Sequence, residues 1–245
     1  FRMPQGPAPA LWQLSSACLS TRLAASLADA AIAAETPQAL RKLPSAWLVS
    51  APVSGRFLQK IGPEQALAWV HENRAQCSGA LREHIAAGAA ELGQAAVLRE
   101  ISQPLDAQMA GRLWQRCDGT RQIRHALLGS DAPLLQVWLD LLRADTSLSQ
   151  EAVAQILMAR NGAGTPVLFD ALYKGKGEIA TFVRDGIVEL ARSQRLAPQA
   201  VDVLLAAKNA DEFPGLHVAL QEGRAHSIEA LVGGVLQARE SGWLT

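Results

Sequence analysis

The segment AVAQILMARN at residues 152–161 decides the fold, because it returns 48 residues further on as AVDVLLAAKN at residues 200–209. The likeness continues downstream with the same gaps. The matched pairs there are Pro166 with Pro214, Leu168 with Leu216, Ala171 with Ala219, Leu172 with Leu220, and Gly175 with Gly223. A period of about 20–50 residues is typical of stacked repeats, each of which buries its apolar face on its neighbours. The sequence therefore predicts a repeat stack that presents an extended surface to another macromolecule.

Weaker copies of the pattern precede these two. One copy, at a spacing of about 45 residues, contains Leu113, Cys117, Asp118-Gly119-Thr120, Ile123 and Ala126-Leu127. An earlier copy contains Ala66-Leu67, Trp69-Val70, Asn73, Leu81, Ile85 and Gly88, with Asn73 in the place of Asn161 and Asn209. We therefore predict a repeat domain of about four units at residues 63–245, the last unit capping the stack, after an irregular helical region at residues 1–62.

Composition favours an all-α protein without a nucleic-acid or membrane role. Apolar residues make up 49% of the chain and aromatic residues only 5%, and the apolar part is dominated by the helix formers Ala and Leu. Lys plus Arg and Asp plus Glu are balanced at 23 each, so no net field attracts a phosphate backbone. The apolar stretch from Leu23 to Ala34 is interrupted by Asp29 and is shorter than the ~20 residues of a membrane span. The three cysteines are far apart, as expected in a reducing compartment, and a start at Phe1 suggests a fragment of a longer protein.

Each repeat is predicted to contain three helical segments. In residues 149–194, Ser149 is placed to cap the first helix, and Asn161 to Gly164 to interrupt the chain. We expect Thr165 to cap a short second helix that begins at Pro166, and Ile179 to Ala191 to form the apolar stripe of a third. In this register Leu168 and Leu216 are fully buried between repeats, as are Ala171 and Ala219.

The segment GTPVLFDAL at residues 164–172, followed by Gly175 and Ile179, resembles the ankyrin repeat, in which TPLHxA opens the first helix. The equivalent segments of the other copies depart from the ankyrin consensus. Arg121 replaces the Pro in one copy, and Phe213 replaces the Thr in the last copy. The longer, Ala-rich style, which covers about Ala66 to Gln237, is similar to the ankyrin-like tails of bacterial type III secreted effectors. This resemblance implies an α-solenoid that binds a host protein after secretion into the host cell cytoplasm.

An armadillo-like or HEAT-like stack remains the alternative fold, since three helices in about 40–47 residues also describe those repeats. The segments around Asp118-Gly119, Gly162–Gly164 and Asp211-Glu212 discriminate between the two. They project on one edge of an ankyrin-like stack and form tight corners in an armadillo-like one.

No pattern in the chain points to catalysis, a cofactor or a metal. The five histidines fall at unrelated repeat positions, and no His/Cys pair has zinc-finger spacing. Cys18, Cys77 and Cys117 are interpreted as small filler residues, and the glycine-rich segments at 161–165 and 174–177 as turns, because neither fits a phosphate-binding motif. The alternatives to a binding module are an enzyme whose active site lies in or upstream of residues 1–62, and a self-associating protein.

The predicted partner-binding edge consists of positions that are equivalent in successive repeats but differ in side chain. Its basic end and its acidic end would orient a partner. Tyr173 and Phe213 are the candidate aromatic anchors, although Phe213 is equally expected to fold back on the adjacent repeat, and Trp138 is expected to pack internally. The predicted partner-binding residues are Arg121, Arg124, Tyr173, Lys174, Lys176, Asp211, Glu212, Phe213, Gln221 and Glu222.

Overall fold

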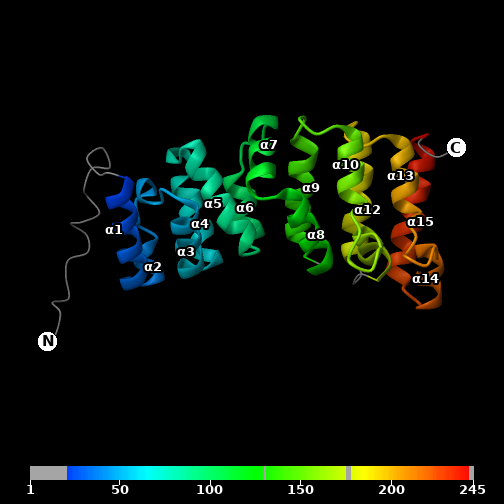
Figure 1. The fold of residues 1–245 in the computed structure, drawn as a ribbon, viewed down its shortest axis with the longest axis horizontal. Helices are drawn as coiled ribbons and strands as arrows, with labels where there is room; N and C mark the ends of the chain where they lie inside the picture. Colours follow the sequence, from blue (N-terminus) through cyan, green and yellow to red (C-terminus); the bar gives the residue numbers. More distant parts are fainter. Residues whose placement is uncertain (1–20, 130, 175–177, 243–245) are drawn as a thin grey trace. The chain divides into compact units, whose positions relative to one another are not determined.

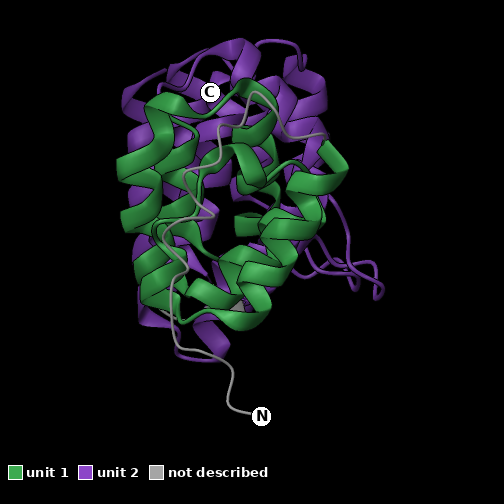
Figure 2. Ribbon diagram, turned by 90° about the vertical axis from the view of Figure 1, so that its left-hand side faces the viewer, with its two compact units in different colours: residues 1–103 green, residues 104–245 purple. Residues whose placement is uncertain are grey.

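The computed structural model describes residues 21–129, 131–174 and 178–242, and within these ranges all regular elements are helices (Figure 1). Two isolated antiparallel β-bridges, Arg160 with Pro166 and Lys208 with Pro214, are the only strand-like pairings of the described residues. The all-α prediction is thus confirmed. The contacts within the chain divide it into two compact units, residues 1–103 and 104–245, which are coloured separately in Figure 2.

Unit 1 is built around α3, which packs against α1, α2, α4 and α5. Its core contains the edge-on pair of Phe57 and Trp69, whose ring centroids are 5.2 Å apart, and the Trp69 indole donates a hydrogen bond to the Leu43 carbonyl at 3.1 Å. Helices α3 and α5 lie on opposite sides of the boundary predicted at residue 62, yet they pack together. The helices of unit 1 are α1 (Thr21–Ala34), α2 (Pro37–Leu40), α3 (Ala51–Ile61), α4 (Pro63–Asn73), α5 (Gly79–Glu91) and α6 (Ala95–Ile101), with 3₁₀ turns at Ser45–Trp47 and Arg74–Gln76.

Asn73 does not play the part of Asn161 and Asn209. It ends α4, and its side-chain amide donates to the Trp69 carbonyl one turn back at 2.9 Å. A 3₁₀ turn then leads directly towards α5, so the chain has no projecting loop here. The predicted equivalence of Asn73 is therefore wrong, because the neighbouring sequence continues the helical path.

Unit 2 consists of three successive repeats of three helical segments each. We call residues 107–144 the first repeat, residues 150–192 the middle repeat and residues 198–240 the last repeat. The short π-helical segment η5 (Asp170–Lys174) completes the second helix of the middle repeat. The helices are α7 (Ala107–Arg116), α8 (Gly119–Gly129), α9 (Ala132–Ala144), α10 (Gln150–Leu157), α11 (Val167–Phe169), α12 (Glu178–Arg192), α13 (Pro198–Leu205), α14 (Gly215–Gln221) and α15 (Ala225–Glu240).

The helix starts of the middle repeat follow the sequence in part. The Ser149 hydroxyl accepts the backbone N–H of Ala152 at 3.2 Å and so caps α10 as expected. Thr165 does not cap α11, for which Pro166 is the N-cap residue without a side-chain bond. The Thr165 hydroxyl instead accepts the N–H of Ala210 in the last repeat at 3.3 Å, because the neighbouring loop brings that donor within reach.

The first repeat lacks the projecting loop that the sequence predicts at Asp118-Gly119. Helix α7 ends at Arg116 and α8 begins at Gly119, so the connection is a tight corner. In the later repeats Pro166 and Pro214 restrict the residue before them to extended backbone. Arg121 at the corresponding position imposes no such restriction, and α8 therefore starts earlier.

Successive repeats of unit 2 bury apolar side chains against one another. Helix α9 packs on α12, α12 packs on α13 and α15, and η5 packs on α14 and α15. Leu168, Ala171 and Ala219 are buried as predicted, and Trp138 is fully buried against Trp114 at a centroid distance of 6.1 Å.

Leu216 was also predicted to be fully buried, and this prediction is wrong. Leu216 is 37% exposed, whereas its equivalent Leu168 is 2% exposed. Within the described chain no further repeat covers the outer side of α14 and α15. Capping repeats have a polar outer face. The last repeat exposes several large apolar side chains on this side, and its capping role stays a prediction.

Candidate functional site between two repeats

Two loops of unit 2 share one hydrogen-bonded scaffold, although their sequences, RNGAGTP and KNADEFP, differ at most positions. We call residues 160–166 the middle loop and residues 208–214 the last loop. In the middle loop the Asn161 side-chain oxygen accepts the N–H groups of Ala163 at 2.9 Å and Thr165 at 3.1 Å. A backbone bond from Asn161 N–H to Thr165 O at 2.8 Å closes the loop.

The last loop repeats this pattern position by position. The Asn209 side-chain oxygen accepts the N–H groups of Asp211 at 3.0 Å and Phe213 at 2.9 Å, and Asn209 N–H donates to Phe213 O at 3.0 Å. An asparagine that binds the backbone two and four residues ahead fixes a turn without help from the packed core. The sequence interpretation noticed that the asparagine recurs but did not assign it this role.

In each loop the fourth residue after the first bridge residue, Arg160 or Lys208, has a left-handed backbone. Gly164 has φ +77° and Glu212 has φ +64°, so the last loop places a glutamate where glycine is unstrained. The Glu212 carboxylate lies 3.4 Å from the Lys208 ammonium, an exposed ion pair that contributes little to stability.

The two loops lie side by side. The bond from Ala210 N–H to Thr165 Oγ1 joins them, and the added Cβ of a side chain at Gly164 would touch the Ala210 methyl at 3.8 Å. In Figure 2 loops of unit 2 extend from one side of its helices. The stack thus holds two loop tips with different side chains in one row.

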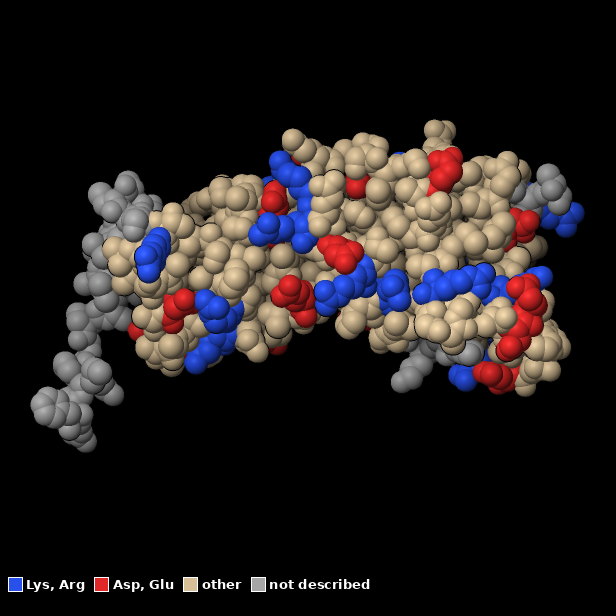
Figure 3. All heavy atoms as spheres, in the orientation of Figure 1, with Lys and Arg blue, Asp and Glu red and all other residues tan. Residues whose placement is uncertain are grey.

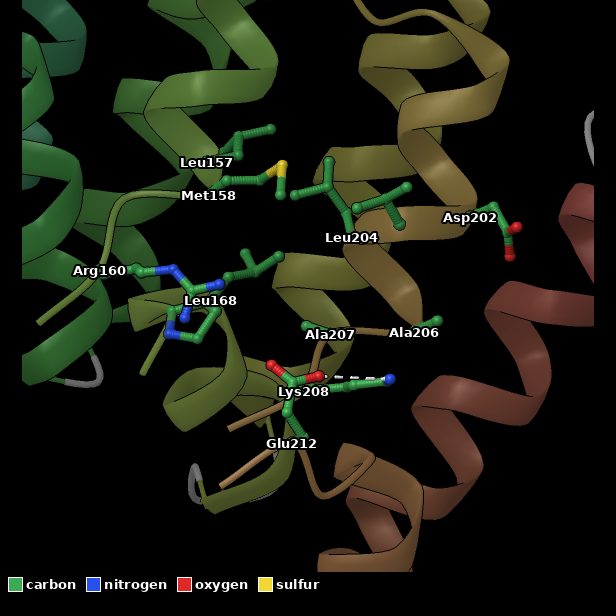
Figure 4. Close-up of a pocket in the computed structure, with 12 residues that line it drawn as sticks. Leu157, Met158, Arg160, Leu168, Asp202, Leu204, Ala206, Ala207, Lys208 and Glu212 are labelled. Carbon is green, nitrogen blue, oxygen red and sulfur yellow. Dashed lines mark ion pairs between the residues drawn. The ribbon is translucent and has the colours of Figure 1, made fainter. Parts of the chain in front are cut away.

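A groove of about 330 Å³ runs between the middle and last repeats at the base of the loops (Figure 4). Leu157 and Met158 at the end of α10 face α13 across it, and Leu168 forms part of its floor. Met158 and Val203 on the two walls are both exposed to solvent. The rim is charged, with Arg160, Asp202, Lys208 and Glu212 around an apolar interior. The sequence interpretation missed this groove, because residues on first helices were treated as core and not as surface.

Tyr173 does not belong to the exposed surface, which corrects its prediction as an anchor. Its ring is fully buried beside Phe169, at a centroid distance of 5.2 Å, and its hydroxyl donates to the Leu205 carbonyl of the last repeat. Burial raises the pKa of the Tyr173 hydroxyl well above its ordinary value. Tyr173 therefore bonds the two repeats together.

Phe213 is exposed, in contrast to Tyr173. Half of its surface is open to solvent, and its ring stacks on His217 of α14 at a centroid distance of 6.0 Å and an interplanar angle of 16°. This ring contact is with the following helix of its own repeat, and the exposed part of the side chain keeps Phe213 a candidate anchor.

The other residues of the predicted edge keep exposed positions in unit 2. Figure 3 shows a row of Lys and Arg side chains across this face of unit 2 and acidic side chains near α14. The Glu222 carboxylate pairs with Arg224 at 3.2 Å. The side chain of Lys174 and the whole of Lys176 lie outside the described residues. The exposed members of the predicted set are Arg121, Arg124, Asp211, Glu212, Phe213, Gln221 and Glu222.

Groups associated with catalysis or metal binding do not converge in the part of the chain that the structure describes. No cluster of three or more His, Cys, Asp or Glu residues able to hold a metal ion occurs there. Cys117 is buried and Cys77 half-buried, and burial raises the pKa of the Cys77 thiol; Cys18 lies outside the described residues. No helix in the described ranges combines the length and apolar character that a membrane crossing needs.

The chain matches no protein-family model, no curated protein and no solved structure. Functional argument therefore depends on the residues of the groove and the loops.

Proposed function

We propose that unit 2 is a protein-binding module of ankyrin-like repeats, which holds a segment of a partner protein in the groove and against the loop tips. The observation that carries the proposal is the shared scaffold of the two loops. Their backbone bonds are the same, while the exposed side chains differ, with Gly162 and Ala163 in one loop and Ala210, Asp211 and Phe213 in the other. Constant scaffolds with variable tips on one face are typical of the binding side of repeat proteins.

The projecting loops favour an ankyrin-like over an armadillo-like or HEAT-like stack. Two of the three discriminating segments form bridged loops, and the third, at Asp118-Gly119, is a tight corner. The resemblance to the repeat tails of type III secreted effectors makes a host protein the proposed partner and the host cell cytoplasm the proposed place of action. We assign unit 2 no catalytic role.

The chemistry of the groove suits a peptide segment. Its interior accepts an apolar side chain, since Met158, Leu168 and Val203 provide nonpolar surface. Its rim carries both charge signs, with Arg160 and Lys208 near Asp202 and Glu212, which suits a polar backbone and orients the ligand. A nucleic acid would require an excess of positive charge that this rim lacks.

A capture experiment with matched variants tests the proposal. The immobilised chain is incubated with a eukaryotic cell lysate, and bound proteins are quantified by mass spectrometry. The test variant carries Met158→Glu and Val203→Glu, two exposed groove positions. The control variant carries Leu128→Glu, since Leu128 is an exposed leucine of the first repeat outside the groove.

We expect a defined protein to be captured by the wild-type chain and the control, and to be reduced by about tenfold or more with the groove variant, which corresponds to loss of one anchor contact. Phe213→Ala should reduce capture by a smaller factor. Equal capture by the groove variant and the control, with circular dichroism showing both folded, would refute the groove as the binding site. Failure of the wild-type chain to retain any protein would refute the proposed function itself.

A further inference from the structure

The outer side of the last repeat is an apolar surface of the kind that other repeats bury. Five of the eleven exposed large apolar side chains in the described ranges belong to α14 and α15, namely Leu216, Leu220, Val232, Val235 and Leu236. Leu220 is 58% exposed where its equivalent Leu172 is 1% exposed, and Val235 and Leu236 are exposed where Ile187 and Val188 are buried. These equivalents are buried because α13, α14 and α15 cover them. The outer surface of α14 and α15 therefore has the composition of a repeat–repeat interface.

A hollow of about 310 Å³ lies on this surface and repeats one wall of the groove described above. Five residues around the hollow are the repeat equivalents of five that line one wall of the groove. Leu205, Ala206, Lys208, Pro214 and Leu216 occupy the positions of Leu157, Met158, Arg160, Pro166 and Leu168. In the groove the opposite wall is α13, a helix. The hollow thus lacks the second helical wall that the groove has.

The same surface also provides an apolar helix stripe. On α15 the exposed residues Val232, Val235 and Leu236 follow the spacing i, i+3, i+4 and lie on one side of the helix. Val235 also lines the hollow. A surface that carries both a hollow and an apolar helix is self-complementary, as a two-fold interface requires.

The charges along α15 also match in a two-fold arrangement. Glu229 lies one turn before Val232 and Arg239 lies one turn after Leu236, all on the same exposed stripe. When two copies of α15 lie antiparallel with their centres at the level of residue 234 along the helix, Glu229 of each copy faces Arg239 of the other, and Val232 faces Leu236. The opposite charges then meet at both ends of the apolar contact.

We propose that the outer surface of α14 and α15 pairs with the same surface of a second copy of this chain, with the two α15 helices antiparallel. In this dimer the second copy buries the apolar surface of the last repeat, as the last repeat buries the corresponding surface of the middle repeat. The hollow shares Asp202, Ala206 and Lys208 with the lining of the groove, whereas Met158, Val203 and the tip of the last loop lie outside it.

Sedimentation equilibrium of the full chain over a concentration series tests the pairing. We expect a monomer–dimer equilibrium for the wild type, and a monomer for the variant that carries Val235→Glu and Leu236→Glu, because four carboxylates then enter the apolar contact. Leu128→Glu is the control and should dimerise as the wild type does, since Leu128 is also exposed but lies on α8. A wild-type chain that stays monomeric, or a dimer that the α15 variant leaves intact, would overturn the proposal.

Charge exchange tests the antiparallel arrangement. Arg239→Glu places like charges opposite each other twice in a two-fold dimer, and should raise the dissociation constant by about tenfold. The double variant Glu229→Arg with Arg239→Glu restores opposite charges and should recover the wild-type constant. The single variants Arg239→Glu and Glu229→Arg, mixed in equal amounts, should form a mixed dimer more readily than either forms a dimer alone. Equal dissociation constants for the wild type, the two single variants and the double variant would exclude the antiparallel α15 contact.

Discussion

The middle and last repeats of unit 2 have closely similar sequences but opposite environments on one side. Leu168 and Leu172 are buried, whereas Leu216 and Leu220 at the same repeat positions face solvent. The two loops, in contrast, keep the same hydrogen bonds in both repeats. Local structure is thus set by the sequence of each repeat, and burial is set by the presence of a neighbour.

Side chains that differ between the two repeats also follow this rule. Tyr173 is buried because α14 and α15 lie beside η5, and its equivalent Gln221 is exposed at the end of α14. Val167 of the middle repeat is buried, while the same position in the last repeat is Gly215, which makes room for the Tyr173 ring. The last repeat is therefore adapted to the repeat before it.

The largest predicted difference between the repeats concerns the two leucines. Leu168→Ala should lower the free energy of unfolding by about 2–5 kcal/mol, because it removes buried methyl groups and leaves a cavity. Leu216→Ala should cost about 1–2 kcal/mol in the monomer, because 37% of this residue is already exposed to water. Urea unfolding followed by circular dichroism, at a concentration that excludes dimers, measures both. Equal losses would show that burial does not differ between the repeats.

The contact between Gly215 and Tyr173 should give the next largest effect. A Cβ at residue 215 would lie 2.0 Å from the Tyr173 ring, so Gly215→Ala should destabilise the protein by about 1–3 kcal/mol through overpacking. Gly162→Ala is the matched control, because a Cβ there meets open space, and should change stability by less than about 0.5 kcal/mol. Thermal unfolding of the two variants distinguishes them, and similar melting temperatures would place Tyr173 away from α14.

The smallest predicted effect separates the two loops. Glu212→Gly should stabilise the protein by about 0.5–1 kcal/mol, because it relieves a left-handed glutamate, whereas Gly164→Ala should destabilise it by about 1 kcal/mol. Glu212→Gln keeps the backbone strain and removes only the exposed ion pair with Lys208, so it should change stability by a few tenths of a kcal/mol. Calorimetric melting of the three variants measures these shifts. A stabilising Gly164→Ala would contradict the shared loop geometry.

The sequence predicted those features that depend on residues close together in the chain. The period of 48 residues, the cap at Ser149, the helix over residues 178–192 and the burial of Leu168, Ala171 and Ala219 all follow from local pattern. The absence of a loop in the first repeat could also have been predicted from the sequence, because Arg121 replaces the proline that delays the helix start in the later repeats. Its significance became clear only when the helix bounds were known.

Features that depend on neighbours could not be predicted in the same way. Repeat equivalence assigns Leu216 the environment of Leu168, but it contains no information on where the stack of the described chain ends. The pattern likewise placed Tyr173 with Gln221 as a surface residue, because it could not show that the last repeat covers one and not the other. The groove required the relative placement of α10 and α13, which no spacing within a single repeat provides.

The bond between Tyr173 and the Leu205 carbonyl gives the protein an intrinsic spectroscopic sensor of contact between its last two repeats. Tyr173 is the chain's single tyrosine, so its phenolate absorbance is not mixed with that of another. Below about pH 10 the hydroxyl is protonated in folded and unfolded chains alike, and its contribution to stability is complete. At higher pH the unfolded chain releases the proton first, because burial raises the pKa in the fold, and stability falls as the folded pKa is approached. The appearance of phenolate in alkaline solution, at a pH below the raised pKa, therefore reports the loss of the buried environment that Tyr173 has between these two repeats.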